Sequence, residues 1–246
     1  MTAATAWCAD PYDDALRTGQ GPLFLSRGDG WLLPLDVERW CEAPDRADRR
    51  VLARCRGAVL DIGCGPGRLV AALAAEGGRA LGIDVSPEAV ERTIRLGGSA
   101  LLRSVFEPLP AEGRWDTALL IDGNIGIGGD PTALLARLRQ VVARHGVVIA
   151  ECAPVELDER FEVRVDDGRG WRGAPFPWAR VGARALAAHA ARAGWAVTGR
   201  WSLAGRHFME LSPESASPSG PVPGPVPGPP SGPSVRVVAL PAPAAG

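Results

Sequence analysis

Short hydrophobic segments alternate with longer amphipathic segments from residue 46 onward, and this alternation predicts an α/β domain. Strands are predicted at 58–62, 79–83, 100–104 and 115–121, and at the segment VVIAE that ends at Glu151. Helices are predicted at about 45–55, at 67–76, at 87–95 and from Asp130 onward, where apolar residues recur at helical spacing. Strands separated by helices in this way imply a parallel sheet that is covered on both faces.

The remaining segments follow less regular patterns. Before residue 46, the sequence predicts a short helix or turn at DPYDDALRTG, two short strands around 27–30 and a helix from Asp36. Beyond residue 152, FEVRVDDGRGWRG predicts a hairpin, APFPWAR predicts a loop rich in proline and aromatic residues, and 181–193 predicts an alanine-rich helix. Two strands joined by a turn near Ala204-Gly205 complete the pattern.

The composition changes at Pro213, because nearly half of the chain's 23 prolines fall in 213–246. Proline removes a backbone donor and glycine adds conformational entropy, so this segment cannot supply a packed core. We therefore predict an N-terminal cap segment at 1–45, a main domain at 46–212, and a disordered tail with polyproline II character at 213–246.

The segment AVLDIGCGPG at 58–67 carries the most informative motif. A predicted strand runs into a turn with glycines at alternate positions, Gly63, Gly65 and Gly67, and a helix follows. Glycine permits positive φ and close approach of a ligand to the backbone, and the first helical turn offers free N–H groups. The next strand ends in Asp84, where a carboxylate can accept hydrogen bonds from both hydroxyls of a ribose. These residues predict a site for a nucleoside-containing cofactor.

Two residues distinguish between the nucleoside cofactors. The dinucleotide fingerprint G-x-G-x-x-G requires a third glycine at a position that Arg68 occupies here. Asp61 precedes the turn, and its carboxylate would repel a pyrophosphate but attract an ammonium group. S-adenosylmethionine carries an ammonium and a sulfonium and has no phosphate, so the residues favour it over NAD.

The segments VLDIGCGPGRLVAALAAEG and ALGIDVSPEAVE closely resemble the first two motifs of class I S-adenosylmethionine-dependent methyltransferases. The resemblance spans roughly 46–212 and implies a Rossmann-like three-layer α/β/α sandwich with about seven mostly parallel strands and an antiparallel final strand. It places Asp61 near the methionine end of the cofactor, Asp84 at the ribose hydroxyls and Val85 beside the adenine. The residues whose backbone would contact the cofactor are Gly63, Cys64, Gly65 and Gly67.

A third motif departs from the family pattern. Many relatives have an acidic residue after the third strand, where it accepts the adenine amino group, but aligning on Leu109-Pro110 places Val105 there. Either the backbone around Val105 and Phe106 holds the adenine, with Phe106 packed against the base, or Glu107 substitutes for the acid.

Acceptor-side candidates come from the loop IDGNIGIGGDP and from aromatic residues elsewhere. Ligands in this fold sit at the carboxyl ends of strands, so Asn124 and Gly126 are expected near the reacting methyl group. Asp122 is the predicted catalytic base for an acceptor that keeps a proton, with His145 and Glu151 as alternatives. The other predicted acceptor-side residues are Phe176, Trp178 and Tyr12, the last as a lid over the cofactor.

The net charge and the lack of one motif narrow the expected class of methyl acceptor. With 27 basic and 28 acidic residues the formal net charge is −1, which gives no overall attraction to nucleic acid or to anionic membranes. The loop after 115–121 also lacks the Asn/Asp-Pro-Pro-aromatic motif that enzymes acting on base amino groups often carry. We therefore expect a small-molecule methyl acceptor, and neither a nucleic acid nor a membrane as partner.

The N-terminus shows no signal-like segment, no apolar run is long enough to span a membrane, and the five cysteines show no pairing pattern. These features favour a cytoplasmic protein, and the three histidines lack metal-ligand spacing, so we expect no metal site. Two alternative functions stay open, a nucleotide-dependent oxidoreductase of similar fold and a non-catalytic S-adenosylmethionine-binding protein. The acceptor, the methylated atom and the oligomeric state also stay open.

Overall fold

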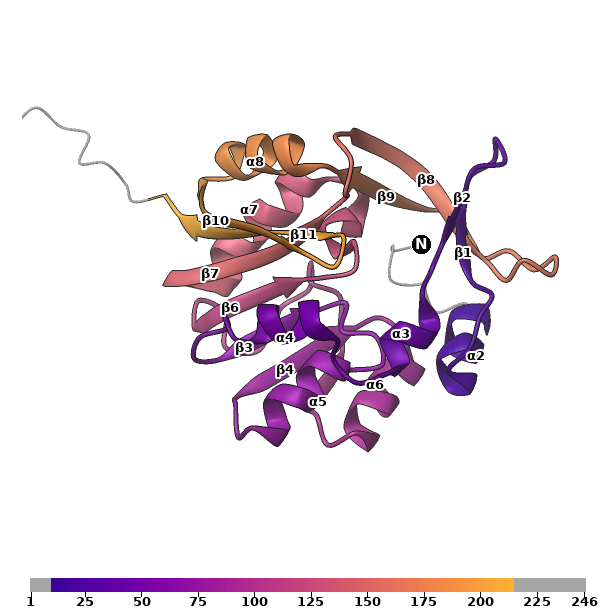
Figure 1. The fold of residues 1–246 in the computed structure, drawn as a ribbon, viewed down its shortest axis with the longest axis horizontal. Coiled ribbons are helices and arrows are strands. Elements are labelled where there is room, and N and C mark those ends of the chain that lie inside the picture. The colour runs from indigo at the N-terminus through magenta and orange to yellow at the C-terminus, as the bar shows by residue number, and fades with distance from the viewer. Residues whose placement is uncertain (1–9, 215–246) are drawn as a thin grey trace, which may run out of the picture. The chain divides into compact units, whose positions relative to one another are not determined.

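A seven-stranded sheet forms the centre of the part of the chain that the structure describes. The computed structural model describes residues 10–214. The strands lie in the order β10-β11-β7-β6-β3-β4-β5 (Figure 1). Their bounds are β3 Val59–Ile62, β4 Ala80–Asp84, β5 Ala100–Leu102, β6 Trp115–Leu120, β7 Val142–Cys152, β10 Trp195–Leu203 and β11 Arg206–Pro213.

The direction of the strands follows the sequence pattern. Strands β3 to β7 pair in parallel, whereas β11 runs antiparallel to β7 and to β10. The turn between β10 and β11 falls at Ala204 and Gly205, which both have positive φ. The predicted Rossmann-like sheet, mostly parallel with an antiparallel final strand, is confirmed.

Helices cover both faces of this sheet (Figure 1). Their bounds are α2 Asp10–Thr18, α3 Val37–Cys41, α4 Arg46–Leu52, α5 Arg68–Ala75, α6 Pro87–Arg95, α7 Pro131–Val141 and α8 Ala183–Arg192. Helices α4 and α5 share one apolar core with Val59 and Leu119, and α7 and α8 share another with Leu60 and Ala118. Because successive residues of a strand point to opposite faces, strands covered on both sides must be apolar throughout.

A second, four-stranded antiparallel sheet joins two segments that lie far apart in the sequence. Its order is β2-β1-β8-β9, with bounds β1 Phe24–Ser26, β2 Leu32–Pro34, β8 Asp158–Asp166 and β9 Phe176–Val181. Leu25 pairs with Val165, so the N-terminal segment and the segment between β7 and β10 form one unit. Together with Leu16 of α2 and Trp178 of β9, these residues form a separate apolar core.

The structure corrects two predictions of local structure. The segment APFPWAR does not form a loop, because β9 begins at Phe176, with Phe176 and Trp178 buried and Pro177 exposed. Proline is tolerated there because β9 is an edge strand of its sheet. The strand predicted at VVIAE begins earlier, because β7 starts at Val142 and includes His145 and Gly146, near an irregularity in the pairing of β7 with β6.

The predicted division into a cap, a main domain and a tail stays a prediction. The segment from Ser215 to the C-terminus lies outside the described residues, so the structure says nothing about the predicted tail. Among residues 10–214, no helix is both long enough and apolar enough to cross a membrane.

Candidate active site

The turn after β3 contains three glycines with left-handed backbone conformations. Gly63, Gly65 and Gly67 have φ values of 68°, 54° and 84°. Gly67 also has no space for a side chain, because a Cβ there would lie 2.3 Å from Thr93 Oγ1 on α6. The N–H of Gly63 donates to the Ile83 carbonyl of β4 at 2.8 Å. The glycine motif therefore forms a turn that is fixed at the carboxyl ends of β3 and β4.

Asp84 lies at the end of β4 and holds this turn in place. Its Oδ2 accepts from the Gly65 N–H at 2.9 Å, and its Oδ1 accepts from the Ser86 N–H at 2.9 Å. Burial raises the pKa of Asp84, and the two backbone donors oppose that rise. A carboxylate has about four acceptor positions, so each oxygen keeps capacity for a ligand hydroxyl. This placement fits the predicted contact with a ribose.

A cleft, here called the main cleft, opens beside Asp84 and encloses about 690 Å³, part of it open to solvent. The predicted cofactor residues that line it are Gly63, Asp84, Val85, Val105 and Phe106. The predicted acceptor-side residues that line it are Tyr12, Asn124, Phe176 and Trp178. The fold thus brings together, around one concave space, most of the residues that the sequence singled out.

Phe106 forms an exposed wall of the main cleft. It is 46% exposed, and a Cβ on Gly128 would lie 2.7 Å from its ring. Val105 is buried, and its carbonyl accepts from Arg137 Nε at 3.0 Å. Glu107 does not line the cleft, and its carboxylate accepts from a backbone N–H at 2.8 Å. Of the two alternatives for holding the adenine, the geometry favours the one in which the aromatic face of Phe106 packs on the base.

Asp61 lies at the base of the glycine turn and is 2% exposed. Burial raises the pKa of Asp61 to about 7, and the nearby Arg68 guanidinium opposes that rise. Among the described residues, its Oδ2 is buried without a hydrogen-bond partner. A buried acidic oxygen without a partner is costly unless a cation reaches it. The ammonium group of S-adenosylmethionine meets that need, so the residues fit the cofactor that the sequence predicts.

Asn124 opens the 3-10 segment η1 (Asn124–Gly129) that follows β6. Its Nδ2 donates to the carbonyls of Ile62 and Gly63 at 2.8 and 2.9 Å, so it ties this segment to the glycine turn. Gly126 does not line the main cleft, because it packs beneath β9. A Cβ on Gly126 would lie 2.2 Å from the Ala179 carbonyl oxygen. The structure gives Gly126 this packing role in place of the predicted approach to the methyl group.

Asp122, the predicted catalytic base, lies at the centre of an ion-pair network. Its carboxylate oxygens lie 2.6 Å from Arg39 Nη2, 2.8 Å from Arg68 Nη2 and 3.0 Å from Arg206 Nη2. Its backbone has φ of 58°, and its N–H donates to Glu151 Oε2 at 2.8 Å. A carboxylate that already accepts from three guanidinium groups has little capacity to take a proton from an acceptor. The geometry therefore assigns Asp122 a positioning role.

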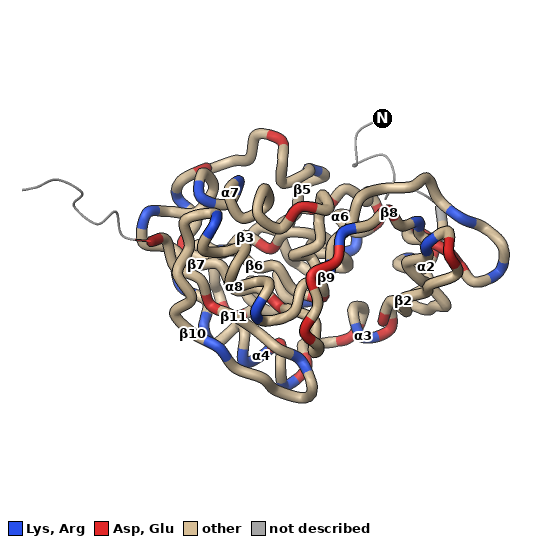
Figure 2. Tube along the Cα trace, turned by 90° about the horizontal axis from the view of Figure 1, so that it is seen from above, with Lys and Arg blue, Asp and Glu red and all other residues tan. Residues whose placement is uncertain are grey.

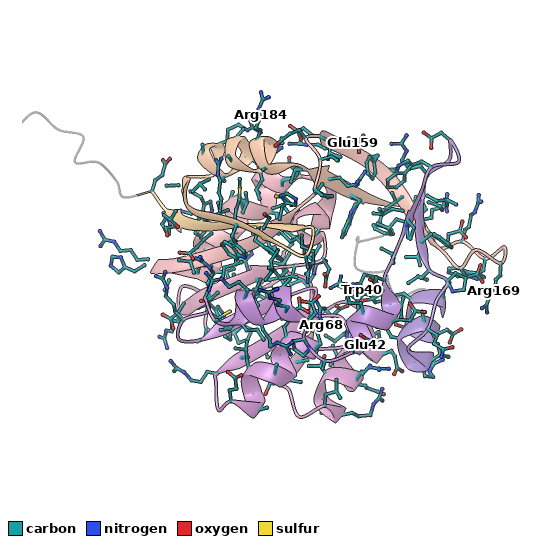
Figure 3. All side chains as sticks on the ribbon, in the orientation of Figure 1. Trp40, Glu42, Arg68, Glu159, Arg169 and Arg184 are labelled. Carbon is teal, nitrogen blue, oxygen red and sulfur yellow. The ribbon has the colours of Figure 1, made fainter. Side chains whose placement is uncertain are left out.

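The same network includes Asp48 of α4. Asp48 accepts from Arg68 Nε at 2.9 Å and from Arg206 Nη1 at 2.7 Å. Although burial opposes it, these guanidinium groups hold the pKa of Asp48 well below its usual range. Figure 3 shows Arg68 beside α4. The network joins α3, α4, α5 and β11 to the end of β6.

Neither alternative base is better placed. Glu151 pairs with Arg206 through both of its oxygens, at 2.8 and 2.7 Å. His145 is exposed near the amino end of β7, whereas the main cleft lies at the carboxyl ends of the strands. The prediction that His145 is a candidate base is therefore wrong for geometric reasons.

Tyr12 covers the glycine turn from the N-terminal side. It is buried on α2, and burial raises its pKa well above the usual value. A Cβ on Gly65 would lie 3.6 Å from the Tyr12 hydroxyl. Helix α2 is held by Arg92 of α6, which donates to the Leu16 carbonyl at 2.6 Å. This is the position that a lid residue requires.

Trp178 of β9 lines three cavities. Besides the main cleft, it lines a cavity of about 450 Å³ under α3, here called the α3 cavity, and one of about 640 Å³ above β7, here called the β7 cavity. The α3 cavity is lined by Tyr12, Leu25, Leu35, Trp40, Gly63, Cys64, Gly65, Pro66, Arg68, Asp122, Asn124 and Trp178. The β7 cavity is lined by Leu25, Leu33, Leu35, Asp122, Gly123, Ile125, Glu151, Cys152, Ala153, Pro154, Trp178, Ala179, Arg180 and Val181.

The sequence analysis missed four residues of this region, namely Arg39, Trp40, Asp48 and Arg206. Arg39, Asp48 and Arg206 form ion pairs between segments that are far apart in the chain, and Trp40 lines the α3 cavity. Local sequence patterns do not predict such long-range contacts. Asp48 alone has a local signal, the reciprocal capping box with Asp45 at the start of α4. That signal predicts where the helix starts, but it does not predict an ion pair.

Comparisons with known proteins agree with this geometry. Residues 59–146 match the family model described as a methyltransferase domain. No curated protein matches the chain. Many solved structures share the fold. An S-adenosylmethionine-dependent methyltransferase from Bacteroides fragilis, solved with S-adenosyl-L-homocysteine, has 20% identity and a TM-score of 0.71 over 87% of this chain and 98% of that chain.

Two further neighbours are less similar. The CcbJ methyltransferase from Streptomyces caelestis has 15% identity and a TM-score of 0.53, covering 69% of this chain and 88% of that one. The 1,6-didemethyltoxoflavin-N1-methyltransferase from Burkholderia thailandensis, solved with that compound and S-adenosylhomocysteine, has 20% identity and a TM-score of 0.51, covering 69% and 78%.

S-adenosylhomocysteine is the product that S-adenosylmethionine leaves after methyl transfer, so its presence in these neighbours bears out the cofactor predicted from the sequence. The matched residues include Gly63, Asp84 and Phe106 of the main cleft, whereas its lining residues Tyr12 and Trp178 lie outside the match. Residues 59–146 therefore match a methyltransferase-domain model, and the chain shares its fold with solved S-adenosylmethionine-dependent methyltransferases.

Proposed function

We propose that this chain transfers a methyl group from S-adenosylmethionine to a small-molecule acceptor. The observation that carries the proposal is the main cleft, where Asp84, Phe106 and the glycine turn meet aromatic residues of β9. Phe176 and Trp178 of β9 line this cleft, so an acceptor bound there would lie against the second sheet.

Each residue has a definite task in this reaction. When bound, S-adenosylmethionine supplies a methyl group on a sulfonium sulfur, ready for in-line displacement by an acceptor atom. Asp84 orients the ribose, Phe106 holds the adenine, and Asp61 attracts the ammonium group. Positioning of this kind supplies roughly 7–11 kcal/mol of a barrier. Since Asp122 and Glu151 are held by arginines, the acceptor is expected to lose its proton to solvent or to carry none.

The β7 cavity supports a small and largely apolar acceptor. Leucines from the N-terminal segment and Trp178 form its walls, and Asp122 and Glu151 lie at one end. Figure 2 shows acidic and basic positions interspersed along the tube of the described residues. The Burkholderia neighbour, which shares the fold, was solved with a small molecule bound.

Two measurements test the proposal. Calorimetry of the full chain with S-adenosylmethionine and with NAD(H) should show binding of the first alone. Radiolabelled S-adenosylmethionine should then transfer label into at least one compound of a metabolite panel. Binding of NAD(H) instead would support an oxidoreductase, and binding without transfer across acceptor extracts would support a non-catalytic binding protein.

A further inference from the structure

The β7 cavity is lined by residues of both sheets, and each sheet contributes charged groups to it. The loop after β6 and strand β7 supply two carboxylates, Asp122 and Glu151. Strand β9 of the second sheet supplies Arg180, which among the described residues is the one basic side chain in this lining. Most of the other lining residues are apolar, so Arg180 places a guanidinium at the edge of an apolar space.

Arg180 differs from the other arginines of this region in how many of its donors are used. Arg206 donates to acidic side chains through all three of its guanidinium nitrogens. In the part of the chain that the structure describes, the side chain of Arg180 donates only through Nη1, to Glu159 Oε2 at 3.4 Å. A guanidinium carries five N–H donors, so most of those of Arg180 can bind a ligand.

The surroundings of Arg180 orient its guanidinium without neutralising it fully. Its Cζ lies 5.4 Å from the ring centre of Trp31, which comes directly before β2. Glu159 is its register partner on β8 (Figure 3). The side chain of Glu159 is 44% exposed and that of Arg180 is 23% exposed. An ion pair of this length with a partly exposed carboxylate is weak, so a better acceptor can displace Glu159.

The shape of a guanidinium and the charges around the cavity favour one kind of anion. The planar fork of an arginine matches a carboxylate, which accepts two parallel hydrogen bonds from it. Asp122 and Glu151 are already paired with Arg206, so Arg180 alone would balance a ligand's charge. A phosphate dianion would bring a second negative charge into the same cavity as these carboxylates, and like charges repel.

We propose that Arg180 binds a carboxylate of the methyl acceptor in the β7 cavity, and that the acceptor is a small monocarboxylic acid with a largely apolar body. This rests on the proposed function, since it takes the β7 cavity as the acceptor site. Of the three cavities, Arg180 lines only this one, whereas the glycine turn lines the other two. The carboxylate is therefore a recognition group and is not the methylated group. Arg180 is a specificity-determining residue.

The test uses probes that differ only in the proposed recognition group. The full chain is saturated with S-adenosylhomocysteine, and calorimetry compares benzoate with benzamide and cinnamate with cinnamamide. Each carboxylate should bind roughly tenfold to a hundredfold more tightly than its amide. Arg180→Gln should abolish this preference. Arg180→Lys, which keeps the charge but loses the planar fork, should retain part of it.

Arg27→Gln is the matched control. Arg27 also lies 5.4 Å from the ring centre of Trp31, but it pairs with Asp29 and does not line the β7 cavity. This variant should keep the preference for carboxylates. Glu159→Gln removes the group that competes for Arg180 and should tighten carboxylate binding, a gain that does not depend on Arg180→Gln being folded. Circular dichroism confirms the fold of each variant.

The outcomes separate this site from the proposed function. A wild type that binds carboxylates no better than amides, or a preference that survives in Arg180→Gln, overturns the carboxylate site. Tighter binding of phenyl phosphate than of benzoate also overturns it. Each of these results leaves the methyltransferase function intact. A wild-type chain that binds neither S-adenosylmethionine nor S-adenosylhomocysteine overturns the proposed function, before any acceptor probe is added.

Discussion

Arg39 of α3 donates from Nη2 to Asp122 Oδ1 at 2.6 Å, across 83 residues of sequence. This contact joins the N-terminal segment to the carboxyl end of β6, at the edge of two cavities. It also engages the carboxylate that the sequence predicts as the catalytic base. Asp122 organises three arginines that come from different elements of the fold.

Asp122→Ala should therefore destabilise the protein strongly. The Arg68 side chain is only 5% exposed and would keep Asp48 as its single carboxylate partner. Removing one member of a buried ion pair costs about 3–5 kcal/mol, and we expect the lower end, since Asp48 remains. Urea unfolding followed by circular dichroism measures the loss.

Asp29→Ala is the control for this experiment, because Asp29 pairs with Arg27 at an exposed turn and its loss should leave stability nearly unchanged. A normal unfolding midpoint for Asp122→Ala, combined with abolished methyl transfer, would return Asp122 to the catalytic role predicted from the sequence.

Asp84→Ala should weaken S-adenosylmethionine binding by roughly tenfold to a hundredfold, since hydrogen bonds to a charged group are worth about 1.5–3 kcal/mol. Calorimetry provides the affinity. Asp130→Ala is a suitable control, because Asp130 also caps two backbone N–H groups but lies outside the main cleft. That variant should lose about 1 kcal/mol of stability and bind the cofactor normally. Unchanged affinity in Asp84→Ala would place the ribose elsewhere.

Cofactor affinity should depend on pH through Asp61. Burial raises the pKa of Asp61 to about 7, so this carboxyl is mostly protonated in the free protein below that pH. Binding of an ammonium requires the ionised form, so affinity should fall as pH drops below 7, by up to about tenfold per pH unit. It should fall again above about pH 8, where an α-amino group loses its proton. Calorimetry from pH 5.5 to 9 should show a maximum between these limits, and Asp61→Asn should lose the acid side of the profile.

The same raised pKa affects the stability of the ligand-free protein. An aspartate in the unfolded chain ionises near pH 3.9, so the folded state loses stability as the pH rises from about 4 to 7. The gap between these two pKa values corresponds to roughly 4 kcal/mol at most. Asp61→Asn should thus raise the melting temperature at pH 8 and change it little at pH 4. A lower melting temperature at pH 8 would show that the ionised carboxylate stabilises the free fold.

Gly126→Ala should impair folding more than turnover. Its Cβ would approach the Ala179 carbonyl oxygen to 2.2 Å and the Trp178 ring to 2.8 Å, so η1 and β9 have to separate. Overpacking of this kind costs about 1–3 kcal/mol. Gly28→Ala, where a Cβ would meet nothing within 4 Å, provides the control in thermal unfolding. Normal stability of Gly126→Ala with lost turnover would support the acceptor contact predicted from the sequence.

The sequence predicted the central sheet well because each of its elements has a local signature. Helix α6 shows this best, since it begins at Pro87, its predicted first residue, directly after the cap Ser86. The glycine turn and the position of Asp84 were equally predictable, because the spacing of these residues along the chain determines their geometry. For the same reason, five of the predicted cofactor residues line the main cleft, namely Gly63, Asp84, Val85, Val105 and Phe106.

Strand β9 could not be predicted from its local sequence. Pro177 removes a donor and interrupts the apolar alternation of Phe176 and Trp178, so the segment resembles a loop until its partner β8 is known. Arg39 and Arg206 were missed for a related reason. Their acidic partner Asp122 is distant in the sequence, and an arginine that pairs over such a distance resembles any surface arginine.

The antiparallel pairing of β1 with β8 limits how the acceptor preference of this protein could be changed by exchanging segments. Leu25 and Val165 are neighbours in one sheet, and Trp178 of the same sheet lines the main cleft, the α3 cavity and the β7 cavity. A chimera that exchanges only the N-terminal segment, or only the segment with β8 and β9, would join two strands that were not selected to pair. Grafting a new specificity onto this scaffold therefore requires both segments to be transplanted as a matched pair from the same donor.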